Sequence, residues 1–152
     1  MLESRRQARE ATLQALYHID TLDHWTMPDI RQFFNHFYKL SDSDLDSNAN
    51  FNFSRSLIEG IIKDKDRIDR LITEAAENWT LERMGRIDRN LLRLSVYEII
   101  FCPETPANVI INEALEISKR FSGEQALNFI NGVLDKVLKA SGLPGRETVL
   151  SE

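Results

Sequence analysis

Residues 79–101 read WTLERMGRIDRNLLRLSVYEIIF, and this stretch decides the fold class. Thr80 is a candidate N-cap for a helix. From Leu91 to Phe101, apolar side chains occupy nearly every side of that helix. A helix that is apolar all round is buried inside a larger protein. We therefore predict that it forms the buried centre of the C-terminal half of the chain.

The rest of the chain also shows helical periodicity, and no segment alternates in the way that is typical of a strand. Helices are predicted over 4–22, 26–40, 54–78, 80–101, 105–121 and 123–140. The polar run KDKDR (63–67) could break the third of these, and SDSDLDSNAN (41–50) has the composition of a loop. The result is an all-α protein of six to seven helices. We expect two small helical subdomains in one compact domain, 1–79 and 80–141, followed by a frayed tail at 142–152.

Composition and the single cysteine indicate the cellular compartment of the protein. The chain has 152 residues, 42% of them hydrophobic, and a net charge of -5. No apolar run approaches the roughly 18 residues that a membrane span requires, and the N-terminus lacks the continuous apolar stretch of a signal peptide. The single Cys102 cannot form an internal disulfide and fits a reducing compartment. These features predict a cytoplasmic protein.

Motifs for catalysis or metal binding are not found in the sequence. No two of the three histidines are three or four residues apart, so helical spacing provides no metal site. Asp42, Asp44 and Asp46 match the start of a calcium loop, but Ser47 replaces its turn glycine and Phe53 its glutamate. There is no phosphate-binding glycine loop and no nucleophile motif. We predict a protein that is not an enzyme and that carries no cofactor or metal.

The first helix starts with an unusual concentration of positive charge. ESRRQARE (3–10) places Arg5, Arg6 and Arg9 in its first two turns, where the helix dipole disfavours cations. Glu3 and Glu10 flank them, which leaves a net charge of only +1. The arginines could form an ordinary solvated face or bind phosphate. In either case we expect exposed side chains that contribute little to stability.

A second candidate surface lies on the last predicted helix, GEQALNFINGVLDKVLKA (123–140). Gln125, Asn128, Phe129, Gly132 and Lys136 lie away from its core stripe. An aromatic ring beside amides and a cation is typical of sites that bind single-stranded RNA. The ring stacks on a base, the amides form hydrogen bonds with base edges, and the cation contacts a phosphate. Glycine inside a helix costs about 1 kcal/mol relative to alanine. Gly132 therefore indicates either a close neighbouring helix or the close approach of a ligand.

Four segments together resemble one protein family. They are SRRQAREATLQALY (4–17), WTLERMGRIDRNLLRLSVYE (79–98), NVIINEALEISKRF (108–121) and NFINGVLDK (128–136). In this order and spacing they resemble the successive signatures of the NusB family of bacterial transcription antitermination factors. The similarity runs from Ser4 to about Ala140 and is weakest over 23–52, a region that the resemblance leaves uninterpreted.

The resemblance implies an all-α, non-enzymatic factor that binds the boxA element of nascent ribosomal RNA together with the ribosomal protein NusE. It also implies that the protein acts on the transcription elongation complex together with other Nus factors. Residues at the positions that contact RNA in the family are Arg5, Arg6, Arg9, Gln125, Asn128 and Phe129. The expected protein-partner surface comprises Leu13, Tyr17 and Asp88. Family members often carry arginine where this chain has Gln7, so we expect a cationic patch that is one charge lighter.

One alternative function stays open at this point. NusB-like domains also precede the catalytic domain of some ribosomal RNA methyltransferases, so the chain could be an accessory helical module that binds RNA or protein. Because the sequence ends at Glu152, we expect no room for an S-adenosylmethionine-binding domain. The sequence also leaves open whether the free protein is a monomer or a homodimer.

Overall fold

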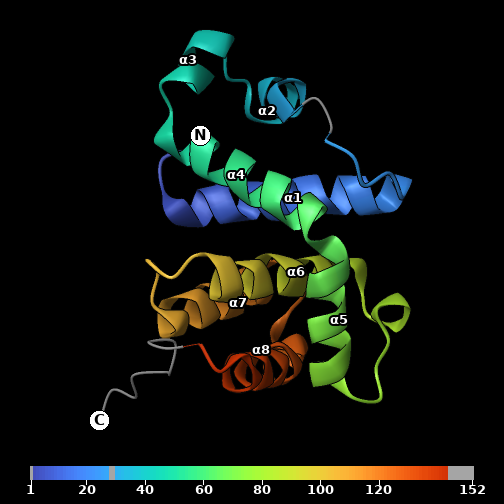
Figure 1. The fold of residues 1–152 in the computed structure, drawn as a ribbon. Helices are drawn as coiled ribbons and strands as arrows, with labels where there is room; N and C mark the ends of the chain where they lie inside the picture. The colour runs from blue at the N-terminus through green and yellow to red at the C-terminus, as the bar shows by residue number, and fades with distance from the viewer. Residues whose placement is uncertain (1, 28–29, 144–152) are drawn as a thin grey trace. The chain divides into compact units, whose positions relative to one another are not determined.

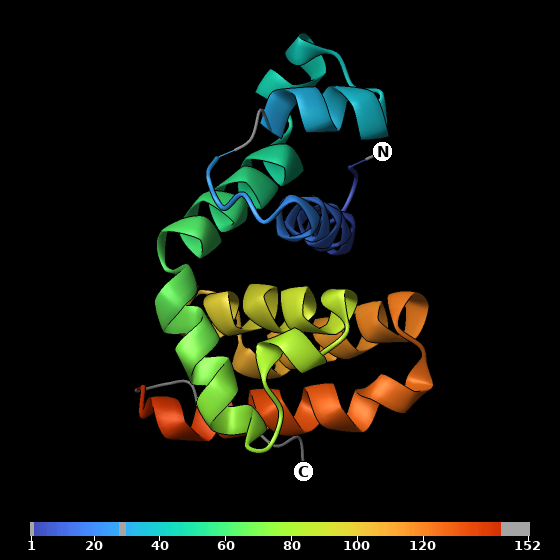
Figure 2. The ribbon, with the colours of Figure 1, turned by 90° about the vertical axis from the view of Figure 1, so that its right-hand side faces the viewer.

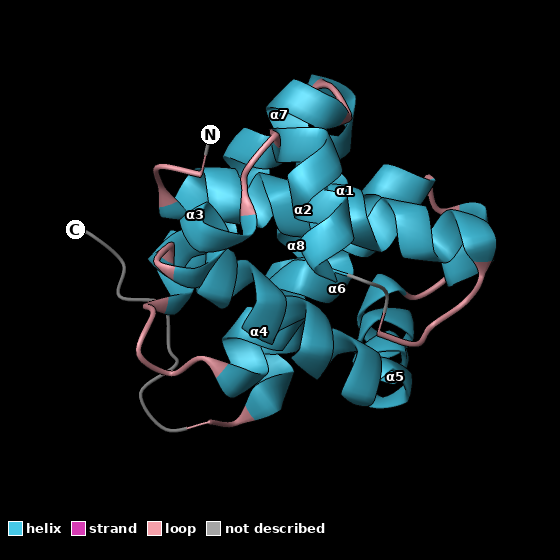
Figure 3. Ribbon diagram, turned by 90° about the horizontal axis from the view of Figure 1, so that it is seen from above, coloured by secondary structure: helices cyan, strands magenta, loops and turns pink. Residues whose placement is uncertain are grey.

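The computed structural model describes residues 2–27 and 30–143, and within these ranges every regular element is a helix (Figures 1 and 3). The predicted all-α fold class is confirmed. The α-helices are α1 (Arg5–Leu22), α2 (Ile30–Tyr38), α3 (Asp42–Asp46), α4 (Ala49–Lys63), α5 (Lys65–Ala76), α6 (Arg86–Phe101), α7 (Ala107–Phe121) and α8 (Leu127–Ser141). Two short 3₁₀ helices, η1 (Leu81–Arg83) and η2 (Glu124–Ala126), precede α6 and α8. None of the described helices combines the length and the hydropathy that crossing a bilayer requires.

Internal contacts divide the chain into two units, residues 1–63 and 64–152. The sequence placed this boundary after residue 79, with α5 in the N-terminal subdomain. In the structure α5 packs against α6 and α8, and its apolar residues Ile68 and Ile72 are fully buried. The division therefore falls within the polar KDKDR run, where the sequence indicated a break. Most of the predicted frayed tail lies outside the described residues.

In the unit of residues 1–63, α1 packs against α4, and all four helices contribute to one apolar core. Its fully buried aromatic rings are Phe34 of α2 and Phe51 of α4, whose centroids lie 5.0 Å apart in an edge-to-face arrangement. A buried polar contact also joins α1 to α4. The Thr12 hydroxyl donates to the Ala8 carbonyl oxygen at 2.8 Å and lies 2.6 Å from the Ser54 hydroxyl. Both hydroxyls are thereby satisfied inside the core.

The start of α1 follows the sequence prediction in part. Ser4 is the N-cap, and its hydroxyl accepts a hydrogen bond from the backbone N–H of Gln7 at 3.1 Å. The Gln7 side chain accepts from the backbone N–H of Glu3, at 2.5 Å, rather than from that of the N-cap. One half of the predicted capping box is therefore formed.

Helix α3 is a correction to the sequence prediction, which assigned residues 41–50 to a loop. Ser41 and Asp44 form a complete capping box, with each side chain accepting from the other residue's backbone N–H. The hydrogen bond from the Ser41 backbone is the main reason that the pKa of Asp44 lies below its ordinary value. Leu45 is fully buried in the core of this unit. A reciprocal cap and one buried leucine thus form a helical turn that composition did not reveal.

In the second unit, α6 and α8 each contact the other helices of the unit, so that α6 packs against α5, α7 and α8 (Figures 1 and 2). Leu91, Leu92 and Val96 are fully buried, as predicted for a helix that is apolar all round. The predicted start at Thr80 was wrong. Residues 81–83 form η1 instead, and α6 begins after Gly85, its N-cap residue.

Candidate nucleic-acid interface

Arg5 is exposed at the start of α1, and its guanidinium is held by α4. Its Nη1 donates to the side-chain oxygen of Asn50 at 2.8 Å and to the Ala49 carbonyl oxygen at 3.3 Å. The guanidinium carbon lies 4.3 Å from the ring centroid of Phe53, within the range of a cation–π contact. These contacts offset the unfavourable helix dipole and hold the cation in place. Because a guanidinium has five N–H donors, others can still reach a phosphate.

The second and third arginines differ in exposure. Arg6 is exposed, whereas Arg9 is only 5% exposed. The guanidinium of Arg9 lies 5.3 Å from the ring centroid of Phe53, the ring that Arg5 also contacts. The expectation that all three side chains are exposed is therefore wrong for Arg9. Periodicity could not show this, because Phe53 lies far along the sequence. Arg5 and Arg6 remain as the accessible cations of this cluster.

In the second unit, a cavity of about 430 Å³ brings together residues that are far apart in the sequence. Six of its lining residues are Trp79, Arg83, Asp88, Ser122, Gln125 and Phe129. We call it the Trp79 cavity. The Trp79 ring is 51% exposed and meets Phe129 edge-to-face, with centroids 6.3 Å apart. Gln125 and Phe129 were predicted to meet RNA, while Trp79 and Arg83 were missed because no local pattern links residues 79 and 129.

The approach to α8 positions Gln125 at the rim of this cavity. Gly123 has φ = 90°, which L side chains rarely adopt, and an added Cβ would lie 2.7 Å from the Gln125 side-chain oxygen. The Gln125 amide donates to the Ser122 carbonyl oxygen at 3.1 Å, so its oxygen can still accept. Asn128, the other predicted amide, is exposed on α8 but does not line the cavity.

Gly132 is exposed on α8, three residues beyond Phe129. A Cβ added at this position would meet no described atom within 4 Å. The described structure thus offers no packed neighbour that would explain a glycine here. Lys136, the cation predicted for the same face, forms an ion pair with Glu77 at 3.1 Å. Gly132 therefore leaves an uncovered patch of backbone next to the predicted stacking residue.

The residues predicted to meet a protein partner differ in accessibility. Tyr17 is 41% exposed, but Leu13 is only 2% exposed and so presents almost no surface. Asp88 is half-buried, and its carboxylate accepts a hydrogen bond from the Ser122 hydroxyl at 2.6 Å. Asp88 lies in the first turn of α6, where the helix dipole favours a negative charge. Asp88 is therefore only partly accessible to a partner.

Comparison with known proteins assigns the chain to a family. A model of the NusB family matches residues 6–139. The chain belongs to the NusB family. The transcription antitermination protein NusB of Geotalea daltonii is 40% identical over 147 residues, which cover 96% of this chain and 100% of that protein. Its counterpart in Desulfotalea psychrophila is 44% identical over 135 residues, covering 88% and 94%.

Solved structures agree with this assignment. NusB of T. maritima superimposes with a TM-score of 0.76 at 34% identity, covering 91% of this chain and 93% of that one. A crystal structure of the antitermination factors NusB and NusE in complex with dsRNA gives a TM-score of 0.76 at 23% identity, which supports the fold alone. It covers 92% of this chain and 99% of that one. As a member of the NusB family, the chain is a transcription antitermination factor and not an enzyme.

Proposed function

We propose that this NusB-family protein binds the boxA element of nascent ribosomal RNA together with NusE. It would do so in the cytoplasm, on the elongation complex with other Nus factors. The observation that carries the proposal is the Trp79 cavity. An exposed indole, a second aromatic ring, an amide and an arginine there provide the stacking, base-edge and phosphate contacts that single-stranded RNA uses. NusE and RNA are proposed as the partners because a NusB of this fold has been solved in complex with both.

Binding of boxA RNA, measured against a scrambled RNA of equal length with and without NusE, tests the proposal directly. We expect tighter binding of boxA than of the scrambled RNA, and a further gain with NusE. By thermodynamic linkage, RNA must then tighten NusE binding by the same factor. Equal affinity for the two RNAs, with and without NusE, would contradict the proposal.

A first prediction concerns Arg6, an exposed cation in the first turn of α1. Arg6→Ala should weaken RNA binding and lower the slope of log affinity against log salt by about 0.7, the value for one phosphate contact on a single strand. The melting temperature should change little, because Arg6 is exposed.

Two further variants serve as controls for Arg6. Arg6→Lys should keep the slope, because it keeps the charge. Arg55→Ala removes another exposed arginine, one that pairs with Glu59 on α4, and should leave RNA binding unchanged. A slope that is the same in Arg6→Ala and in the unmodified protein would show that Arg6 contacts no phosphate.

A second prediction concerns Asp88, which we propose faces the basic protein NusE. Asp88→Asn removes the charge but keeps an oxygen that can accept from the Ser122 hydroxyl. NusE binding should weaken by about two- to fivefold, which is the scale of an interfacial charge pair near solvent. RNA binding should stay equal or improve, because a negative charge leaves the Trp79 cavity. Unchanged NusE affinity, measured by calorimetry at low salt, would remove Asp88 from this interface.

A further inference from the structure

The unit of residues 1–63 contains a second cavity, of about 550 Å³, between α1 and α2. Six of its lining residues are Ala15, His18, Gln32, Phe33, His36 and Phe37. We call it the α1–α2 cavity. Its α2 side belongs to the stretch that the family resemblance left uninterpreted. Its volume is in the range of sites that bind small ligands, about 300–1,000 Å³.

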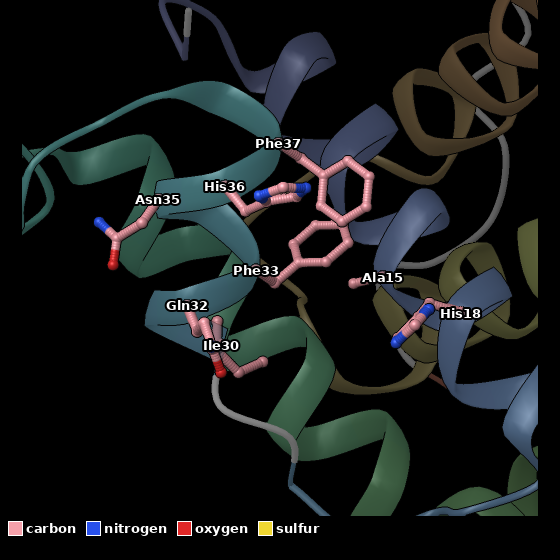
Figure 4. Close-up of a pocket in the computed structure, with 8 residues that line it drawn as sticks. All are labelled: Ala15, His18, Ile30, Gln32, Phe33, Asn35, His36 and Phe37. Atoms are coloured by element: carbon pink, nitrogen blue, oxygen red, sulfur yellow. The ribbon is translucent and has the colours of Figure 1, made fainter.

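Three rings form a series across this cavity. The centroids of Phe33 and Phe37 lie 4.7 Å apart, with planes inclined by 36°. The imidazole of His18 lies 6.5 Å from the Phe33 ring, with an inclination of 39°. In Figure 4, Phe33 and Phe37 extend from α2 toward α1, where His18 and the small side chain of Ala15 lie opposite.

A flat ligand can enter between His18 and Phe33 only if His18 moves. A planar group stacked on both rings needs parallel faces about 7 Å apart, whereas the two centroids lie 6.5 Å apart with planes inclined by 39°, the geometry of a direct contact. The exposed His18 must therefore move outward and turn parallel to Phe33 before a base is admitted. Phe37 is 57% exposed and offers a second ring face at the mouth of the cavity.

Polar groups on the lining distinguish this cavity from a purely apolar groove. The imidazoles of His18 and His36 and the amide of Gln32 can donate or accept hydrogen bonds, as the edge of a nucleobase requires. Asn35 points away from the rings, and its amide donates to the Leu40 carbonyl oxygen (Figure 4). No carboxylate is among the described residues that line the cavity.

We propose that the α1–α2 cavity binds an unpaired nucleobase from RNA that flanks the boxA element. The base stacks between His18 and Phe33, and the polar groups of the lining contact its edge. The inference rests on the proposed RNA-binding function for the source of the base. It adds a binding site on the N-terminal unit that is distinct from the arginine cluster at the start of α1. It also gives a role to residues 30–37.

The test uses the full-length protein and two probes. The first is a single-stranded RNA with boxA and three further nucleotides on each side, compared with boxA alone. The second is a titration with uridine and adenosine monophosphates, followed through the ¹H–¹³C resonances of the histidine and phenylalanine rings. We expect the longer RNA to bind more tightly, and the nucleotides to shift His18, His36 and Phe37 in a saturable manner.

Variants from both helices assign the effect to the cavity. Phe37→Ala and His18→Ala replace exposed side chains. Each should weaken binding of the longer RNA by at least about fivefold, as the loss of a stacked ring does. Both should leave boxA alone unaffected. Leu22→Ala is the matched control, because Leu22 is 62% exposed on α1 and does not line the cavity.

The outcomes separate this inference from the proposed function. If boxA binds normally but flanking nucleotides add nothing and the rings do not shift, the inference is overturned while the proposed function stands. If no RNA binds at all, the proposed function fails, and the nucleotide titration still decides whether the cavity takes a base. If Phe37→Ala weakens only NusE binding or only self-association, the cavity accommodates a side chain of a protein, and the inference is wrong.

Discussion

Asp69→Ala should lower the free energy of unfolding by about 3–5 kcal/mol, the cost of removing one partner from a buried ion pair. Asp69 on α5 accepts from Arg93 Nε at 2.8 Å and from Arg93 Nη2 at 3.2 Å. The side chain of Arg93, on α6, is only 6% exposed. Without Asp69 its charge stays buried, with a hydrogen bond to the side-chain oxygen of Asn90 as one remaining contact. Denaturation by urea measures the loss.

Two other variants test this explanation. Glu74→Ala removes an exposed carboxylate from the same helix and should change stability by no more than about 0.5 kcal/mol. Replacing both partners, with Asp69→Ala and Arg93→Met, should recover much of the loss, because the buried guanidinium is then gone. Lys65, which also pairs with Asp69 at 3.0 Å, has a side chain that is 24% exposed to water. A cost below about 1 kcal/mol for Asp69→Ala would show that water reaches Arg93 and solvates it.

The fold was predictable from the sequence because its main signals are local. An apolar run around a full helix identifies α6, and the polar run at 63–67 indicates the break between α4 and α5. Helix α3 was missed because its signals are one capping box and a single buried leucine inside a segment rich in aspartate and serine. Local composition favoured a loop, while the contribution of Leu45 to the core favoured a helix. The tertiary contact prevailed.

The candidate site was predictable only where its residues are neighbours in the sequence. The arginines at the start of α1 and the amide and aromatic residues near the start of α8 were found in this way. The burial of Arg9 depends in part on Phe53, and the aromatic partner of Phe129 is Trp79. Both contacts join residues that are more than 40 positions apart, so no helical period reveals them. Burial also decides which predicted surfaces are accessible, as Leu13 shows with an exposure of only 2%.

The largest expected effect on function comes from the Trp79 cavity. If each ring stacks on an RNA base, Trp79→Ala and Phe129→Ala should each weaken boxA binding by about 1–3 kcal/mol. Trp79 is half exposed, so its loss should change the melting temperature little. Phe129 is more buried and should also lower stability. Val109→Ala, at a 39% exposed residue of α7, is the control for loss of an exposed apolar side chain.

The double variant shows whether one base or two are bound. Because the centroids of Trp79 and Phe129 are 6.3 Å apart, both rings can contact the same base. In that case the double variant, with both Trp79→Ala and Phe129→Ala, should lose little more RNA affinity than either single variant. The coupling energy between the two substitutions should then be large. If each ring stacks on its own base, the losses should add to about 2–6 kcal/mol. Filter binding and thermal melting on all four proteins give both quantities. Normal RNA affinity in a destabilised Phe129→Ala would instead assign the ring to the packing of α8.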